Sequence, residues 1–438
     1  MSIAIAFIVQ NYNKYSFAAL AGALESMPKT KDMPIYFLPG KDVDRLAQEV
    51  KRAATKYDTL AVCFSFATTN IVEVYKTLAK LRANLDSNQV IYIAGGPHAT
   101  GDPTETLQLG FDIAVIGEAE ETFPELICAL SDGLDWRQIK GIAYTDHDGR
   151  FMRTGKRRPI DLNRFAPFST KHNKLSPIEI SRGCPHACRF CQTSFIFGGK
   201  MRHRKLGEIL KYISLSKANG TRDFRFISPN SLAFGSNDGK TVNLAAIEEL
   251  LVEASKITGK KHLFFGSFPS EVRPEAVSKD ALNLITTYTA TKQLVVGAQT
   301  GSQRMLDKLH REHTVEDVYR AVELILACGL DVSVDFIFGL PGETKADRES
   351  SIKMIDNLTD MGAKIHSHTF IPLPGTPLSN AKTGIVDKEL SRYLSRLANK
   401  GLQFGQWHTQ QRLAKEAFIF RAKSGTQSTT NPVIRNLQ

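Results

Sequence analysis

The stretch SRGCPHACRFC at residues 181–191 contains three cysteines, Cys184, Cys188 and Cys191, in the spacing C-x3-C-x2-C. Thiolates are the preferred protein ligands of iron–sulfur clusters, and three of them can hold three irons of a [4Fe–4S] cluster. The fourth iron then has no protein ligand and can bind a small molecule. Electron-transfer clusters normally have four cysteines, so the spacing predicts a catalytic cluster.

A structural zinc site is the alternative interpretation of this loop. Such a site needs four closed ligands, usually two C-x2-C pairs or paired cysteines and histidines. Only three cysteines are present here, although His186 or His203 could complete a set.

The cysteine spacing and its flanks resemble the radical SAM superfamily, whose free iron chelates the amino and carboxylate groups of S-adenosylmethionine (SAM). Phe190, the aromatic residue before the last cysteine, also fits that family's loop. The resemblance implies that Cys184, Cys188 and Cys191 bind the cluster and that Phe190 lies at the SAM site.

The composition is that of an ordinary globular protein, and 438 residues are enough for two or three domains. The N-terminus has no basic leader before its apolar run, and no apolar run approaches the length of a membrane span. Cys63, Cys128 and Cys328 each lie in an apolar segment, as small buried hydrophobes do, and indicate no disulfide framework. We therefore expect a cytoplasmic protein without membrane contact.

The net charge of +11 comes mainly from two basic regions, one between residues 150 and 205 and one after residue 390. The first includes Arg153, Lys156, Arg157 and Arg158. The C-terminal region lacks the interleaved aromatic residues of a single-strand stacking platform. A solvated basic face or a dock for an acidic protein is therefore favoured over a nucleic acid partner.

Residues 1–140 alternate near-continuous apolar strands with helical patterns. This alternation predicts a parallel sheet covered on both faces, which is a doubly wound, Rossmann-like α/β domain. The predicted strands are Ile3–Val9, Pro34–Leu38, Thr59–Phe66, Val90–Ala94 and Ile113–Ile116.

Residues 141–175 begin with a hairpin pattern and continue as a charged, proline-containing stretch, which predicts a linker. Residues 176–380 resume the strand–helix alternation six times, which suits the partial (β/α)6 barrel of the radical SAM architecture. The predicted strands are 178–181, 223–227, 262–266, 293–297, 332–338 and 364–371. Residues 381–438 predict a C-terminal helical extension, beginning with an amphipathic helix, and a basic polar tail from Lys423 that orders on substrate binding.

Catalytic groups of parallel barrels lie at the carboxyl ends of their strands, and the cysteine loop directly follows the first of these strands. The later strand ends carry polar residues and GxPGET-like and PLPGTP elements that resemble the family's SAM site. Taken singly, each polar residue is equally well explained as a loop cap or turn former. The second strand lacks the Gly-Gly-Glu element of many members. The residues that the resemblance assigns to SAM binding are Phe190, Ser228, Asn230, Ser267, Glu271, Arg273, Gln299, Thr300, Ser302 and Asp335.

Two loops of the first domain, GGPHAT at residues 95–100 and GEAEE at residues 117–121, resemble the cobalamin-binding domain that precedes many radical SAM barrels. Glycine pairs let a bulky flat ligand approach the backbone. The loop after the first strand lacks the D-x-H-x-x-G element that supplies a histidine to cobalt. Cobalt then has no strong lower protein ligand, which is the favoured alternative, or takes Tyr12 or His98. The residues assigned to cobalamin are Asn11, Tyr12, Tyr15, Ser65, Gly95, Gly96, Pro97, His98, Gly117, Glu118 and Glu120.

The combined resemblance implies a cobalamin-dependent radical SAM methyltransferase that methylates an unactivated sp3 carbon, with a [4Fe–4S] cluster, SAM and methylcobalamin as cofactors. In that family a 5′-deoxyadenosyl radical removes the hydrogen. The opening residues and the GGPHAT and FPSEVRPE segments resemble an archaeal branch that includes the enzyme methylating a glutamine of methyl-coenzyme M reductase. This branch implies a peptidyl glutamine Cα as substrate, and ferredoxin or flavodoxin as the electron donor.

Three alternatives remain beside this interpretation. The first is the same chemistry on a small natural product or lipid, and the second is a non-enzymatic cobalamin- or cluster-binding regulator. The third, a methylthiotransferase, requires three further cysteines for a second cluster. The first domain has only Cys63 and Cys128, which disfavours it.

Overall fold

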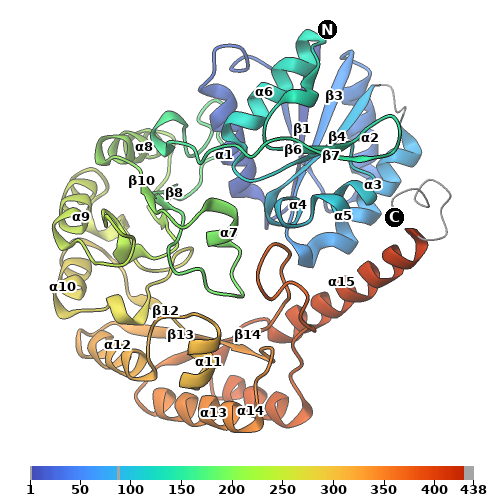
Figure 1. Cartoon of the computed structure of the whole chain (residues 1–438). Helices are drawn as coiled ribbons and strands as arrows, with labels where there is room; N and C mark the ends of the chain where they lie inside the picture. The colour runs from blue at the N-terminus through green and yellow to red at the C-terminus, as the bar shows by residue number, and fades with distance from the viewer. Residues whose placement is uncertain (1, 86–88, 429–438) are drawn as a thin grey trace. The chain divides into compact units, whose positions relative to one another are not determined.

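The computed structural model describes residues 2–85 and 89–428, and the chain divides into two compact units. The first unit contains residues up to Ser176 with Leu373–Gly375 and the chain from Leu413 onward. The second contains Pro177–Pro372 and Thr376–Arg412 (Figure 1). Among the described helices, none combines the length and the apolar character that a membrane crossing requires.

The first unit contains a seven-stranded sheet in the order β2-β1-β3-β4-β5-β6-β7, of which the first five strands are parallel. This is the doubly wound order whose ligand site lies between the carboxyl ends of β1 and β3. The strands are β1 Ile3–Val9, β2 Ile35–Pro39, β3 Thr59–Ser65, β4 Val90–Gly95, β5 Ile113–Val115, β6 Ile142–Thr145 and β7 Phe151–Arg153. The helices are α1 Lys14–Glu25, α2 Val43–Ala54, α3 Ile71–Asn84, α4 Gly96–Gly101, α5 Pro103–Gln108 and α6 Ala119–Asp132.

Strand β1 shows why this sheet is covered on both faces. Because side chains alternate along a strand, Ile3, Ile5 and Phe7 enter one core with residues of α1 and α6. Ala4 and Ala6 enter the opposite core with residues of α2 and α3. Figure 1 shows α2 and α3 on one side of the sheet and α1 and α6 on the other. The prediction of a doubly wound α/β domain is confirmed.

Residues 141–175, predicted as a linker, fold as part of the first unit. Strand β6 pairs antiparallel with β5, and β7 pairs antiparallel with β6, so the predicted hairpin extends the sheet. Further along, Ile160, Leu162 and Phe165 form a small core with Ala23 of α1. These apolar residues pack residues 141–175 against the first unit, although the charge and proline content of this segment predicted a linker between domains.

The second unit contains a parallel strand series that forms a partial barrel. Strand β8 Ile178–Glu179 pairs with β11 Phe226–Ile227, and single bridges join Phe224 to Leu263 and Val272 to Val296. The series continues through β12 Gln293–Gln299, β13 Asp331–Phe338, β14 Lys364–Thr369 and β15 Gln403–Phe404.

Several details of the barrel differ from the sequence prediction. The first two predicted strands are shortened to Ile178–Glu179 and Phe226–Ile227. The third predicted strand, His262–Gly266, is reduced to a short bridge, because a 3-10 turn ends at His262 and Gly266 has φ +70°. Strand β15 was not predicted, since only two residues pair there.

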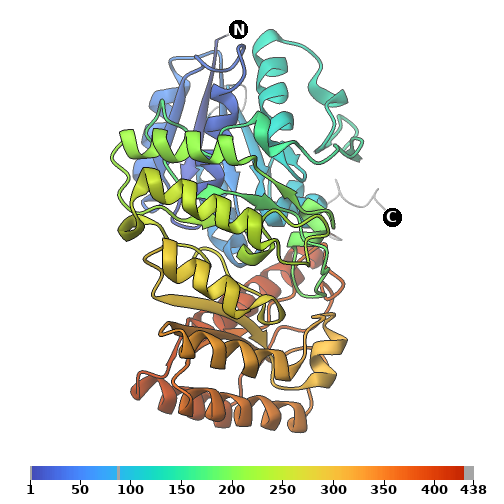
Figure 2. The same ribbon diagram turned by 90° about the vertical axis from the view of Figure 1, so that its left-hand side faces the viewer.

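The barrel helices lie side by side in chain order, most clearly α8, α9 and α10 (Figure 2). The helices of this unit are α7 Thr193–Phe197, α8 Leu206–Ala218, α9 Leu244–Thr258, α10 Lys279–Tyr288, α11 Gln303–Lys308, α12 Val315–Ala327, α13 Lys345–Asp360 and α14 Lys388–Asn399.

The C-terminal extension consists of α14, which buries Leu390, Leu394 and Leu397 as its pattern predicts, and α15 Trp407–Ser428. The first turns of α15 belong to the second unit. Its later turns belong to the first unit, where Ala417 joins the core beside α2 and α3. Helix α15 continues through residues 423–428 of the predicted polar tail, and residues 429–438 lie outside the described part of the chain.

Candidate active site

The cysteine loop lies at the carboxyl end of the first barrel strand and is folded by its own backbone. The Cys184 N–H donates to Gly198 O at 3.1 Å, and the Cys191 N–H donates to Cys188 O at 3.0 Å. Ser194 Oγ donates to Cys184 O at 2.7 Å and accepts from the Ala187 N–H at 3.1 Å. Helix α7 thus holds the loop that carries all three cysteines.

The three thiols fit an iron–sulfur cluster better than a zinc ion. The ligands of one tetrahedral zinc lie about 3.8 Å apart. Within residues 2–85 and 89–428, no group of three or more Cys, His, Asp or Glu ligand atoms within 4.8 Å of one another includes a cysteine. All three cysteines are free and lie on one loop, as the ligands of different irons of one cluster would.

The two histidines that could have completed a zinc site have other partners. His186 Nδ1 lies 2.7 Å from Glu312 Oε2. His203 Nδ1 lies 2.8 Å from Ser181 Oγ, and its Nε2 lies 2.9 Å from Ser236 O.

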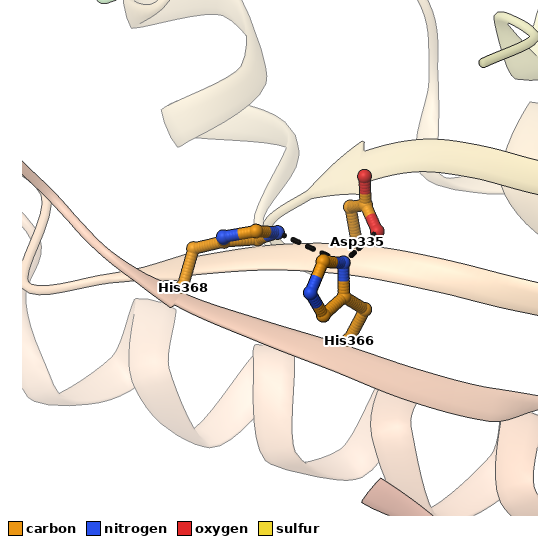
Figure 3. A group of neighbouring side chains, drawn as sticks. All are labelled: Asp335, His366 and His368. Atoms are coloured by element: carbon orange, nitrogen blue, oxygen red, sulfur yellow. Dashed lines mark hydrogen bonds and ion pairs between the residues drawn. The ribbon is translucent and has the colours of Figure 1, made fainter. Parts of the chain in front are cut away.

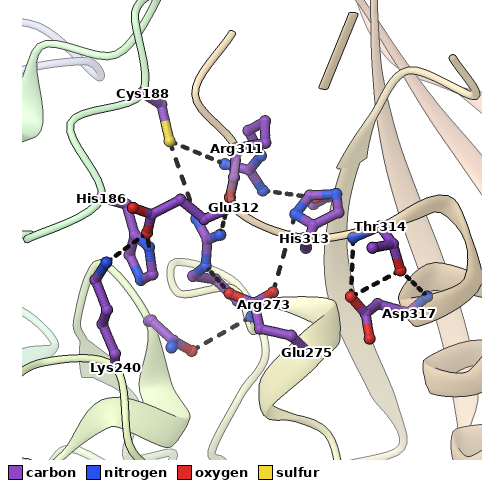
Figure 4. Close-up of polar contacts among 12 residues, drawn as sticks. His186, Cys188, Lys240, Arg273, Glu275, Arg311, Glu312, His313, Thr314 and Asp317 are labelled. Carbon is purple, nitrogen blue, oxygen red and sulfur yellow. Dashed lines mark hydrogen bonds and ion pairs between the residues drawn. The ribbon is translucent and has the colours of Figure 1, made fainter. Parts of the chain in front are cut away.

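Two arginines flank Cys188, and sequence reasoning found only one of them (Figure 4). Arg311 Nη1 lies 3.5 Å from Cys188 Sγ, and its Nη2 donates to Gly297 O at 2.7 Å. Arg273 Nη1 lies 3.9 Å from the same sulfur, and its Nε pairs with Glu275. Both arginines are about 5% exposed, so two nearly buried cations face the cysteine loop.

The segment 310–313 also supplies Glu312, which joins the cysteine loop to the next barrel loop. Its carboxylate lies 2.7 Å from both His186 Nδ1 and Lys240 Nζ. Burial lowers the pKa of His186 to about 4, and burial lowers the pKa of His313 to about 3, so both are neutral near pH 7. The polar run His-Arg-Glu-His between α11 and α12 is the sequence signal that could have indicated these residues.

Three residues predicted to bind SAM are engaged in loop hydrogen bonds. Ser228 Oγ donates to Asn230 O at 2.8 Å, and Asn230 Oδ1 accepts from the Arg273 N–H at 3.3 Å. Ser267 Oγ accepts from Arg225 Nη1 at 3.0 Å. These hydrogen bonds join successive barrel loops. The three residues therefore have the loop-forming role that was the alternative to SAM binding.

Two more of these residues secure helices after the fourth strand. Thr300 Oγ1 lies 3.1 Å from Ser351 Oγ on α13. Ser302 caps α11 and donates to Asp347 Oδ1 at 2.6 Å.

The remaining predicted SAM residues surround the same strand ends. Gln299 has φ +73° at an irregularity in the β12–β13 pairing. Phe190 packs against the core that contains Met305 and Leu309. Glu271 is beside Gly297, and Asp335 Oδ1 lies 3.0 Å from His366 Nδ1.

In the first unit, Asn13 organises the switch point between β1 and β3. Its Nδ2 donates to Ile8 O at 3.1 Å and to Ser65 O at 3.0 Å, and its Oδ1 accepts from the Gln10 N–H at 2.8 Å. This buried residue was not predicted. It positions the loop that exposes Asn11 and Tyr12 and leaves Tyr15 half-buried.

The glycines of this sheet edge fit a bulky ligand. A Cβ at Gly117 would meet nothing within 4 Å, and a Cβ at Gly95 would meet only Phe64 O at 4.0 Å. Gly96 is required by the fold itself, because its φ is +88° and a Cβ there would lie 2.8 Å from Ser65 Oγ. Gly95 and Gly117 therefore leave an open cradle where a cobalamin ring system can approach the backbone.

His98, predicted as a possible cobalt ligand, lies in the interior instead. It is fully buried and stacks on Phe66 with ring centroids 5.2 Å apart. Its Nδ1 lies 3.1 Å from Thr68 Oγ1, and its Nε2 lies 3.4 Å from Glu105 Oε2. The short helix α4 that follows Gly95 turns the ring inward, so both nitrogens face protein groups.

The other predicted cobalamin residues near this edge have structural contacts. Pro97 occupies the first turn of α4. Glu118 Oε2 accepts from the Ile160 N–H at 2.8 Å, and Glu120 is buried in the first turn of α6.

Comparison with known proteins agrees with the two-unit organisation. Residues 2–127 match the B12 binding domain, and residues 178–355 match the radical SAM superfamily. An uncharacterized protein of Methanopyrus kandleri is 24% identical over 87% of this chain and 77% of its own length. An uncharacterized methyltransferase of Pyrococcus horikoshii is 26% identical over 78% of this chain and 74% of its own.

A tRNA-2-methylthio-N6-dimethylallyladenosine synthase of Wolbachia from Brugia malayi is 23% identical over 76% of this chain and 73% of its own. Among solved structures, the radical SAM methyltransferase TsrM from Kitasatospora setae, with cobalamin and a [4Fe–4S] cluster bound, has a TM-score of 0.65 at 16% identity. That match covers 86% of this chain and 77% of TsrM, and shows the same fold.

The radical SAM domain uses a [4Fe–4S] cluster and SAM, and the B12 binding domain uses cobalamin. The three-cysteine loop and the glycine cradle supply the residues that these groups require. The chain therefore joins a B12 binding domain to a radical SAM domain, the combination expected of a cobalamin-dependent radical SAM methyltransferase.

Proposed function

We propose that this enzyme methylates an unactivated sp3 carbon of a protein substrate, with the Cα of a glutamine in the alpha subunit of methyl-coenzyme M reductase as the favoured target. When bound, SAM and the cluster supply the oxidant that removes a hydrogen atom from carbon, and cobalamin supplies the methyl group. The protein's own residues position these groups and exclude water.

The number and placement of the cysteines favour methyl transfer over methylthio transfer. Methylthiotransferases need a second cluster in addition to the radical SAM cluster. Cys63 is buried in β3, where burial raises the pKa of its thiol, and Cys128 lies in α6. With no third cysteine in the first unit, these two residues do not form a second cluster site.

The second unit supplies the residues that bind the cluster, and the first unit supplies the residues that bind cobalamin. Cys184, Cys188 and Cys191 hold the cluster, while the buried Arg273 and Arg311 place positive charge beside an anionic centre. In the first unit, Gly95 and Gly117 leave room for cobalamin at the sheet edge.

Exposed basic residues support a protein partner with an acidic surface. Arg153, Lys156 and Arg158 are exposed in the first unit. Arg157, in contrast, pairs with Glu121 and Glu125 and is neutralised within the fold. The same basic face could receive an acidic electron carrier such as ferredoxin or flavodoxin.

Anaerobic reconstitution tests the proposal. The protein, loaded with iron, sulfide and hydroxocobalamin, is incubated with dithionite, SAM and a peptide spanning the target glutamine. We expect 5′-deoxyadenosine, S-adenosylhomocysteine and a peptide heavier by one methyl group, and none of these from C188A. If both nucleoside products form without peptide methylation, the substrate assignment is wrong and a small-molecule substrate is favoured. If neither forms with both cofactors verified spectroscopically, the protein is a regulator.

A further inference from the structure

Asp335, which the sequence resemblance assigns to SAM binding, forms a group of polar side chains in the second unit with His366 and His368, which have no such assignment. We call these residues the histidine–aspartate triad (Figure 3). Asp335 on β13 is the register partner of His366 on β14, and His368 lies two residues further on the same face. Asp335 Oδ1 lies 3.0 Å from His366 Nδ1, and His368 Nε2 lies 3.1 Å from that same nitrogen.

Gln410 determines which nitrogen of His368 carries the proton. The backbone N–H of Thr369 donates to Gln410 Oε1 at 2.9 Å, so the other end of the amide must be its NH2 group. That NH2 group lies 3.0 Å from His368 Nδ1, which must therefore accept. Neutral His368 carries its proton on Nε2 and donates it to His366 Nδ1.

With these protonation states, the triad has no hydrogen-bond donor left for Asp335 Oδ1. His366 Nδ1 already accepts from His368, so it has no proton for Asp335 Oδ1, 3.0 Å away. Two acceptors this close favour a donor between or beside them, supplied by water or by a bound group, because unpaired acceptors in a partly buried site are costly. The Asp335 and His366 side chains are 14% and 30% exposed, so an outside group can reach them.

A metal ion is a poor candidate for that outside group. The three ligand atoms lie within 4.8 Å of one another, as metal ligands do. A histidine that binds metal through Nε2, however, normally donates its Nδ1–H to an acceptor. Gln410 presents a donor to His368 Nδ1 and is held in that orientation by the Thr369 backbone. His368 Nε2 therefore offers a proton rather than a lone pair.

Glu271 extends the acceptor surface across the sheet. Gly297 is the register partner of Asp335, and Glu271 Oε2 lies 3.3 Å from the position that a Cβ of Gly297 would occupy. Two N–H donors border the same position, Arg311 Nη2 at 3.2 Å and Gln299 Nε2 at 2.7 Å. In the described part of the chain the Glu271 carboxylate makes no side-chain hydrogen bond. On the opposite side of the triad, Phe404 stacks on His366 with ring centroids 4.6 Å apart and fixes the ring.

We propose that Asp335 and His366, with Glu271 beside them, form a substrate subsite for a nitrogen group that donates hydrogen bonds: a carboxamide, amine or guanidinium. His368 and Gln410 are positioning residues that keep His366 Nδ1 an acceptor. The inference rests on the proposed function for the identity of the group, which for a glutamine substrate is the side-chain carboxamide. A carboxylate in the same place would face the Asp335 carboxylate and is rejected.

The first experiment needs no substrate. In the full-length protein labelled with 15N-histidine, NMR should show His368 protonated on Nε2 only. In Gln410→Glu the carboxylate still accepts from Thr369 but now also accepts from His368, so the proton should move to Nδ1. A wild-type His368 already protonated on Nδ1 would overturn the proposal, as would shifts of His366 and His368 on addition of Zn2+, which would indicate a metal centre.

The second experiment probes the subsite with acetamidinium, a small cation with N–H donors. It should shift the His366 resonance in wild-type protein and in Asp331→Asn, an exposed control on the same strand, but not in Asp335→Asn. No shift in the wild type, or an equal shift in Asp335→Asn, would overturn the proposal.

The third experiment compares two peptides that differ only by glutamine or glutamate at the target position. Wild-type enzyme loaded with cluster and cobalamin should bind the glutamine peptide tighter by on the order of tenfold or more. Asp335→Asn should lose this preference, and Asp331→Asn should keep it. An unchanged preference in Asp335→Asn counts against the subsite. If neither peptide binds while acetamidinium does, the subsite stands and the proposed substrate is wrong.

Discussion

The Arg311 guanidinium lies 3.5 Å from Cys188 Sγ and is held there by the backbone carbonyl of Gly297. A nearly buried cation beside a cluster ligand stabilises the reduced, more negative cluster. The arginine is supplied by the segment after α11, more than 100 residues from the cysteine loop. This segment therefore contributes to the electronic environment of the cluster.

Arg311→Gln should lower the reduction potential of the reconstituted cluster, because it removes the buried positive charge. We expect a decrease on the order of 60 mV, which for one electron is a tenfold change in the equilibrium constant. Redox titration followed by EPR without SAM measures it. Arg320→Gln, at a half-exposed position on α12, is the control and should leave the potential unchanged. Equal potentials in wild type and Arg311→Gln would contradict the assigned role.

Gly95→Leu should abolish cobalamin binding without unfolding the first unit. Gly95 has φ −144°, which any residue adopts, and its Cβ would meet only Phe64 O at 4.0 Å. The added side chain would then fill the cradle. Visible absorbance of the desalted protein gives the bound cobalamin. Gly155→Leu, in a surface loop of the same unit, should bind as the wild type does, and retained cobalamin in Gly95→Leu would show that the cradle lies elsewhere.

His98→Gln should destabilise the first unit but leave the absorption spectrum of bound cobalamin unchanged. The imidazole is fully buried between Phe66, Thr68 and Glu105, so its replacement loses packing and polar contacts worth about 1–3 kcal/mol. Thermal unfolding measures the loss. A changed cobalt spectrum at full occupancy would instead identify His98 as a ligand.

Asp347→Asn should lower the melting temperature of the second unit at neutral pH. Hydrogen bonds from Arg304, Ser302 and Thr344 hold the pKa of Asp347 well below its usual range. Because the pKa of this carboxyl is lower in the folded protein than in the unfolded chain, its ionised form stabilises the fold at pH values above the unfolded-state pKa near 4. This stabilisation is lost as the pH falls toward the folded-state pKa.

The loss at pH 7 should be about 2 kcal/mol, or roughly 4–8 °C, carried mainly by the buried Ser302 hydroxyl, since Arg304 is half exposed and Thr344 is exposed. The difference from wild type should shrink below about pH 4. Asp360→Asn, exposed at the other end of α13, should shift the melting temperature little at either pH. A difference from wild type that is the same at pH 7 and at pH 2 would argue against a charge effect.

Periodic features of the chain were predictable from sequence, and features that depend on long-range contacts were not. The apolar runs of β1 and β3 have nearly the predicted bounds, because burial on both faces of the sheet makes these runs apolar throughout. The cysteine loop was predictable because its ligands lie within eight residues. Arg311 and Asn13 were not, because only the fold brings them to the cysteine loop and the switch point. His98 was misplaced, because spacing does not show that α4 turns its ring inward.

Helix α15 completes the first unit from the far end of the chain. Ala417 and Phe420 pack with the core of α2 and α3, and Arg421 pairs with Asp102 and Glu105. During synthesis, the segment up to Ser176 leaves the ribosome without this helix and must wait for more than 230 further residues before its surface is covered. The order of domains along the gene is therefore not the order in which they finish folding, and a fragment cut at the apparent domain boundary would lack part of its own core.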